Sequence, residues 1–252
     1  MAVLTAGTLV VSYLVLAVGL TLYHVPTPNH RSNLMVVGLL GFNFLNIFIA
    51  LCEIGLGRHV KDIQDRYLEM KQFIDNHKNR KVWHQVLDFF TMPLTIQQTI
   101  DGKTFPVQMW STYALYDPAY QNNLSYGFFI DVGNGYTTIL PCLLVNLALT
   151  KPLMLIDRLD NAHLWVSCVG IASYWQIAYG TIVYFAQFIY HQRYKSHGSI
   201  EVFLFVVLMN AIWIVFPLFG IFACVEILKA GSLTCLNNVD KGFLTQFQLP
   251  YY

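Results

Sequence analysis

Five apolar runs, each long enough to cross a bilayer, constrain this chain more than any other feature of its sequence. A membrane-spanning helix needs about 20 mainly apolar residues, because its backbone polar groups must pair within the helix. The runs cover residues 3–23, 33–57, 126–149, 164–190 and 200–228. They predict an all-α polytopic membrane protein, a bundle of five transmembrane helices.

Composition supports a membrane protein without metal or nucleic-acid chemistry. Only 12% of the residues are charged, whereas soluble domains contain about 25%. The 15 basic and 14 acidic residues nearly cancel, which gives no indication of a nucleic-acid partner. The five cysteines lack metal-ligand spacing, and neither a phosphate-binding loop nor a nucleophilic triad is visible. We therefore expect no metal site.

The chain divides into three predicted parts. Residues 1–32 are a first transmembrane anchor with a short loop, residues 33–230 a four-helix membrane domain, and residues 231–252 a C-terminal tail. Within the membrane domain, residues 58–125 form a long loop that is not apolar enough to cross. Lysine and arginine are more numerous on the side of this loop, but the positive-inside rule weakens for loops of this length. Orientation therefore stays open.

The long loop itself contains two segments with expected structure. In residues 58–79 apolar side chains recur at helical spacing among charges, which is typical of an amphipathic helix. Such a helix lies on the membrane surface or extends the second span into solvent. Residues 93–120 mix proline, glycine, glutamine and aromatic residues. They predict a structured cap or a re-entrant segment.

Three polar residues, Asn43, Asn46 and Glu53, interrupt the second run. Asn46 and Glu53 lie seven residues apart and therefore on one face of a helix. For the Asn46 amide, interhelical hydrogen bonding and a functional role are both open interpretations. An ionisable group at mid-membrane costs about 2.5–3.5 kcal/mol even on the most lenient scale. Because Glu53 has no basic residue near it in the same run, a functional role is favoured.

The third run carries a second carboxylate. Asp131 and Asn134 are three residues apart, so a helix places them side by side. Gly127, Gly133 and Gly135 would let another helix or a flat ligand approach the backbone. An acid near the membrane interface, early in the helix, is the alternative interpretation of Asp131.

The last two runs add an amide and aromatic side chains. Asn210 and Trp213 repeat the spacing of three in the fifth run, ahead of Pro217. They would offer an amide and a π-face to a ligand inside the bundle. The fourth run contributes residues that either line the same cavity or join helices. These are Tyr174, Gln176, Tyr179, Tyr184 and Gln187.

This set of groups suits acid–base chemistry on an alkene. A carboxylic acid kept protonated by burial can donate a proton to a double bond. A second carboxylate can remove a proton elsewhere on the same ring system. The face of a Trp stabilises a cationic intermediate by about 2 kcal/mol or more where water is excluded. No organic cofactor is needed, because moving protons is enough to shift the double bond.

Four residues that precede the third run are spaced as in a known family. Trp110, Tyr113, Asp117 and Tyr120 follow one another at intervals of three, four and three, and Asp131 comes eleven residues later. This pattern resembles the emopamil-binding protein family of sterol delta-8 to delta-7 isomerases and the wider EXPERA group. The sequences 209–213 with Pro217, 179–180 and 184–185 also resemble that family. The resemblance extends over residues 42–228.

The resemblance implies roles for individual residues. The catalytic acids of that family correspond to Glu53 and Asp131 here, and the residue next to its third-span acid corresponds to Asn134. The pair that stabilises the carbocation corresponds to Asn210 and Trp213. Substrate-binding residues are expected at Tyr113, Asp117, Tyr120, Tyr179 and Tyr184. The family has a His four residues before its second-span acid, and here that position is Ile49. Because that His is expected in the proton shuttle, its replacement bears on activity.

Three functions follow as hypotheses. The first is a membrane isomerase that shifts a ring double bond of a sterol-like or terpenoid substrate through a carbocation. The second is a membrane terpenoid cyclase, which would also begin by protonating an alkene or epoxide. The third is a sterol- or lipid-binding or trafficking protein without turnover. The expected partners are a hydrophobic polycyclic small molecule, membrane lipid and a second copy of the chain, and the expected location is the endoplasmic reticulum.

Overall fold

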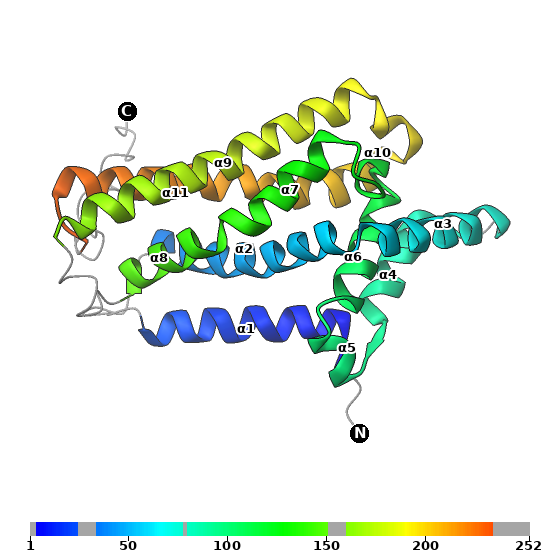
Figure 1. Ribbon diagram of the computed structural model, residues 1–252, viewed down its shortest axis with the longest axis horizontal. Coiled ribbons are helices and arrows are strands. Elements are labelled where there is room, and N and C mark those ends of the chain that lie inside the picture. The colour runs from blue at the N-terminus through cyan, green and yellow to red at the C-terminus, as the bar shows by residue number, and fades with distance from the viewer. Residues whose placement is uncertain (1–3, 25–33, 78–79, 151–159, 234–252) are drawn as a thin grey trace, which may run out of the picture.

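Long helices lie side by side along the molecule, and a compact cap covers one end of them (Figure 1). The computed structural model describes residues 4–24, 34–77, 80–150 and 160–233. The long elements are α1 (Ala6–His24), α2 (Leu34–Arg58), α7 (Tyr126–Thr137), α8 (Ile139–Thr150), α9 (Ala162–Tyr190) and α11 (Met209–Ala230). The all-α prediction is confirmed, apart from one short pair of strands.

Three helices of the described residues are long and apolar enough to cross a membrane, namely Val36–Arg58, Ala162–Tyr190 and Ser199–Ala230. A fourth span is obtained if the bent pair α7 and α8 counts as one. The apolar part of α1, Ala6–Leu20, is shorter. The membrane character is therefore supported, while the number five stays a prediction.

The third predicted span is not one straight helix. It divides at Thr138 into α7 and α8, which are bent by 48°. Pro141 stands in the first turn of α8 and has no N–H with which to reach the carbonyl of Thr137. The continuous helix expected over 126–149 is corrected in this respect, because one missing hydrogen bond allows the axis to turn.

The fifth span is continuous but changes its winding. It begins as α10 (Ser199–Val202), continues as the π-helical turn η3 (Phe203–Leu208) and ends as α11. Asn210 follows the π-helical turn, and its side-chain Nδ2 donates to the carbonyl of Val206 at 2.8 Å. Widened turns of this kind leave backbone groups open and are frequent at functional sites.

The cap is folded, as predicted for residues 93–120. Its elements are α3 (Val60–Asn76), α4 (Val82–Thr91), β2 (Pro93–Leu94), α5 (Ile96–Ile100), α6 (Thr104–Ala114) and the 3-10 turn η1 (Pro118–Tyr120). Strand β2 pairs antiparallel with β1 (Leu4–Thr5), which ties the cap to the first helix. The connection between α9 and α10 lies at the same end of the bundle (Figure 1).

Helix α3 is amphipathic, as predicted, but its apolar face packs against protein rather than lipid. Its buried residues Ile63, Tyr67 and Met70 belong to the apolar core that it shares with α6. The helix leaves the bundle directly after α2 (Figure 1). Its apolar face is therefore covered by protein, and the alternative of an extension of the second span describes α3 better than a helix lying on lipid.

Candidate functional site

The two predicted carboxylates face each other across the contact between α2 and α7. Glu53 on α2 is 6% exposed. A Cβ placed on Gly135 would lie 2.9 Å from Glu53 Cβ, and Gly135 is one helical turn beyond Asp131, on the same face. The two carboxyl groups are close enough to interact electrostatically. The sequence alone could not establish this pairing, because the two acids lie on different helices.

Glycine makes this approach of the two helices achievable. The same Cβ on Gly135 would also lie 2.9 Å from the backbone oxygen of Ala50 and from the nitrogen of Ile54. These contacts are too short for a side chain, so α2 and α7 meet there backbone to backbone. The prediction that Gly135 admits a neighbouring helix is confirmed, whereas Gly133 faces open space within the described residues.

Within the described residues, several buried polar groups of the bundle lack a hydrogen-bond partner, among them the hydroxyls of Ser167 and Ser173, and Glu53 is one that carries a carboxyl group. No hydrogen bond to its carboxyl group occurs among the described residues, although the side chain is buried. Buried polar groups in folded proteins nearly always have a partner. A buried carboxyl without a protein partner is therefore a group that a ligand can engage.

Aromatic side chains of the cap cover Asp131. Tyr120 is 2% exposed and its side chain interacts with Asp131. The rings of Trp110 and Tyr120 stack at 5.2 Å, and Tyr113 meets Tyr120 edge-on at 5.2 Å. Burial raises the pKa of Tyr113 and of Tyr120 above the ordinary value of a phenol. Both phenols therefore stay protonated and can act as hydrogen-bond donors.

A chain of hydrogen bonds joins this aromatic group to the fourth and fifth spans. The Tyr113 hydroxyl pairs with the Tyr184 hydroxyl at 2.9 Å and accepts from Asn210 Nδ2 at 2.9 Å. Tyr120 thus interacts with Asp131, and Tyr113 links Tyr184 and Asn210 through hydrogen bonds. We call Glu53, Asp131, Tyr113, Tyr120 and Tyr184 the acid cluster.

Trp213 and Asn46 are joined about two helical turns from Glu53 along α2. The Trp213 indole N–H donates to Asn46 Oδ1 at 3.1 Å, and Asn46 Nδ2 donates to Thr138 Oγ1 at 3.0 Å. Of the two interpretations of Asn46, interhelical hydrogen bonding is confirmed. The bond also fixes the plane of the indole ring, whose edge meets the ring of Phe42 with 6.3 Å between centroids.

Asn134 also has a protein partner. Its Oδ1 accepts from Gln176 Nε2 at 2.9 Å, and the same nitrogen lies 2.6 Å from Thr137 Oγ1. The amide is buried, at 8% exposure. It therefore joins α7 to α9, next to the carboxylates rather than between them.

Asp117 has a structural role that the sequence did not indicate. It is fully buried, and its Oδ1 accepts from the backbone N–H of Ala119 at 2.9 Å and from Arg193 at 2.6 Å. Burial raises the pKa of the Asp117 carboxyl, while the Ala119 N–H and the Arg193 guanidinium act in the opposite direction. This oxygen caps η1 and joins the cap to the α9–α10 connection, while the substrate-binding role of Asp117 stays a prediction.

Tyr179 lies apart from the other predicted residues. It is 48% exposed and stacks on Trp175, with ring centroids 6.0 Å apart. Its position on α9 directs it to the outer face of the bundle, away from the other predicted residues, and its substrate-binding role stays a prediction. Tyr184, five residues later, faces inward at 3% exposure.

Deep in the spans lies a second polar group, whose members Asn43 and Tyr174 stand out in the sequence but whose pairing through Asn146 was not predicted. Asn43 Nδ2 donates to Asn146 Oδ1 at 2.8 Å, and the Tyr174 hydroxyl donates to Asn43 Oδ1 at 2.8 Å. We call these three residues the amide network. The available signal was an asparagine in each of two apolar runs, but their sequence separation hid the pairing.

The acid cluster is suited to moving protons. It combines two interacting carboxyl groups with three phenols, and the amide of Asn210 is bonded to it through the Tyr113 hydroxyl. The described residues contain no group of three or more His, Cys, Asp or Glu side chains that could hold a metal ion.

No family model, curated protein or solved structure matches this chain. The resemblance to the sterol isomerase family therefore stays a prediction. Function has to be argued from the chemistry of the residues in the acid cluster and from their positions.

Proposed function

We propose that this chain is an integral membrane isomerase that shifts a ring double bond of a sterol-like or terpenoid substrate by acid–base chemistry. The observation that carries the proposal is the pairing of Glu53 and Asp131 between α2 and α7. Carboxylates in membrane spans are costly, so a pair of them calls for a function. Neither has a lysine or arginine partner among the described residues, which argues against a purely structural ion pair.

The reaction needs one protonated and one ionised carboxyl group. The protonated acid gives its proton to one carbon of the ring alkene, which leaves a tertiary carbocation on the other carbon. The ionised carboxylate then takes a proton from a carbon next to the cation, and the electrons of that C–H bond form the new double bond. The substrate keeps its composition, and a proton exchange between the acids restores the starting state.

The groups around the acids would stabilise the cation and orient the substrate. Trp213 offers a π-face whose plane is set by its bond to Asn46, and aromatic faces attract cations. Asn210 holds the Tyr113 hydroxyl at 2.9 Å. Fixed dipoles of this kind stabilise developing charge without reorganisation.

The proposal includes the arrangement in the membrane. Helix α1 lies along α2 (Figure 1), and the Tyr13 hydroxyl donates to the carbonyl of Phe44 at 2.8 Å. We take α1 as a fifth span, with α7 and α8 together as the third. Residence in the endoplasmic reticulum and a homodimer are carried over from the resemblance to the sterol isomerase family.

A sterol-binding protein without turnover is the second candidate. The observation that favours it is Ile49, one turn before Glu53, where the family has a His. Without that imidazole, proton exchange between the acids and solvent would have to use another route. The aromatic groups would then hold a ligand without converting it.

The test is complementation of a yeast strain that lacks sterol delta-8 isomerase, with sterols identified by gas chromatography–mass spectrometry. We expect the wild-type chain to restore delta-7 sterols, and Glu53→Gln and Asp131→Asn to abolish them at unchanged protein abundance. Glu226→Gln is the matched control, because this carboxylate pairs with Lys229 on the surface, far along α11. Delta-8 sterols that persist with abundant wild-type protein would contradict sterol isomerisation and favour the binding protein.

A further inference from the structure

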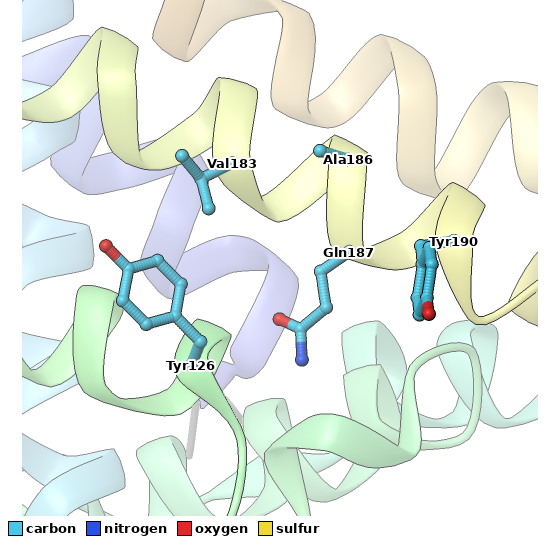
Figure 2. A pocket seen from close by; sticks show the side chains of 5 residues that line it. All are labelled: Tyr126, Val183, Ala186, Gln187 and Tyr190. Atoms are coloured by element: carbon cyan, nitrogen blue, oxygen red, sulfur yellow. The ribbon is translucent and has the colours of Figure 1, made fainter.

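A shallow depression opens on the outer surface between the start of α7 and the last turns of α9 (Figure 2). Tyr126 comes from α7, and its ring lies opposite Val183 and Gln187 of α9, while Ala186 and Tyr190 complete the lining (Figure 2). Both helices belong to the candidate membrane spans. The depression therefore faces lipid, at the depth where spans end and tyrosines are enriched.

The lining of the depression suits one kind of ligand. Val183 and Ala186 form the apolar part of the lining, which we call its floor. Tyr126, Gln187 and Tyr190, which we call its rim, add two hydroxyls and an amide. None of these five side chains is charged. This combination fits a rigid apolar ring system with one neutral hydroxyl group, which would lie on the floor and reach the rim with its hydroxyl.

A phospholipid fits this lining less well, because its phosphate would need a cation. The nearest cations along the chain follow the end of α9. Arg193 is paired with Asp117, and Lys195 Nζ donates to Gln192 Oε1. Phosphate recognition normally uses arginine or lysine, and neither is among the five lining residues, so the lining itself favours a neutral headgroup.

Behind the depression lies the acid cluster. A Cβ on Gly127 would lie 3.4 Å from the Tyr120 hydroxyl and 3.6 Å from Gln187 Oε1. Gln187 Oε1 also accepts a hydrogen bond from the Gly127 backbone N–H at 3.2 Å. Gly127 thus lies next to both the lining residue Gln187 and Tyr120, whose side chain interacts with Asp131.

We infer that this depression is the entry site at which a neutral, hydroxyl-bearing polycyclic molecule leaves the bilayer on its way to the acid cluster. The hydrogen bond from the Gly127 N–H to Gln187 Oε1 holds the first turn of α7 against α9, so it has to break before the ligand can pass between these helices. The inference rests on the proposed function in one respect, namely that the ligand is the substrate of Glu53 and Asp131.

The test is photolabelling of the purified full chain in phosphatidylcholine vesicles with a tritiated cholesterol analogue that carries a ring diazirine. We expect labelled peptides to contain Tyr126 or residues 183–190. Ala186→Trp fills the floor and should lower that labelling about fivefold, the effect of losing about 1 kcal/mol of contact. Ile189→Trp is the control, because Ile189 is 60% exposed on the same helix but does not line the depression.

Two outcomes would overturn the entry site. One is labelling that Ala186→Trp leaves unchanged. The other is equal labelling of these peptides by a diazirine phospholipid. Sterol turnover is measured on the same variants, and a lower turnover in Ala186→Trp than in Ile189→Trp would support the entry site. Labelling at the depression without turnover by the wild-type chain would support the site and contradict the isomerase alone.

Discussion

The acid cluster and the amide network are two polar groups in one apolar bundle, and they differ in charge and in hydrogen bonding. In the amide network, the Asn43 amide both donates to Asn146 and accepts from Tyr174, at 2.8 Å each. All three residues are neutral and at most 5% exposed. In the acid cluster, Glu53 is similarly buried but finds no hydrogen bond among the described residues.

The difference indicates what each group is for. Neutral side chains that hydrogen-bond one another hold helices together at modest cost, although the Asn146 Nδ2 group of the amide network has no partner of its own among the described residues. Interacting carboxylates with incomplete hydrogen bonding destabilise a bundle, so they persist where a function requires them. The packing around them agrees, since α2 and α7 approach backbone to backbone at Gly135 to bring the acids together.

The comparison is tested most severely by placing a carboxylate in the amide network. Asn43→Asp keeps the shape but sets an oxygen against Asn146 Oδ1, where Nδ2 now donates. We expect a loss of about 3–5 kcal/mol in the free energy of unfolding, because the site offers no cation. Reversible unfolding in bicelles measures it. Asp131→Asn, the reverse change in the acid cluster, should leave stability near that of the wild type, and equal losses would refute the distinction.

The next largest effect concerns the ion pair that fixes the cap over the acid cluster. Arg193→Met leaves Asp117 buried without its cation and should lower stability by about 3 kcal/mol. The double variant Asp117→Asn/Arg193→Met removes the charge while keeping an acceptor for Ala119. It should recover most of the loss in the same unfolding measurement. A double variant as unstable as the single one would show that the guanidinium matters for packing rather than for charge.

A smaller effect is expected where the two helices meet. Gly135→Ala forces a Cβ to within 2.9 Å of Ala50 O and should cost about 1–3 kcal/mol, as overpacking does. It should also lower turnover by separating Glu53 from Asp131. Gly133→Ala on the same helix meets no atom within 4 Å, so it should stabilise α7 by up to about 1 kcal/mol. If both changes behave alike in thermal unfolding, the close approach is not what positions the acids.

The smallest expected change in stability gives the sharpest contrast between the two groups. Tyr174→Phe removes a donor to Asn43 and should cost about 1 kcal/mol without changing turnover. Tyr113→Phe removes a phenol that Asn210 and Tyr184 contact. It should lower turnover about 100-fold if the hydroxyl orients the reacting ring. Parallel unfolding and sterol assays decide, and a loss of turnover in Tyr174→Phe would undo the division of roles.

Local properties of the sequence account for much of this protein. Hydropathy is a sum over neighbouring residues, so it locates apolar runs well, and α2, α9 and the fifth span end within about three residues of the predicted limits. Glu53 and Asp131 could be singled out for the same reason, because a charge within an apolar run is conspicuous without any knowledge of its surroundings.

Contacts between distant residues were decided only by the tertiary structure. Asn43 and Tyr174 are 131 residues apart and Asp117 and Arg193 are 76 apart, and no periodicity links such positions. The bend at Thr138 and the outward position of Tyr179 depend on how helices pack, which hydropathy does not describe. Whether a buried polar side chain is bonded or left open is thus a property of its neighbours in space. What separates the two groups here is that the acid cluster brings two carboxyl groups together, whereas the amide network is neutral.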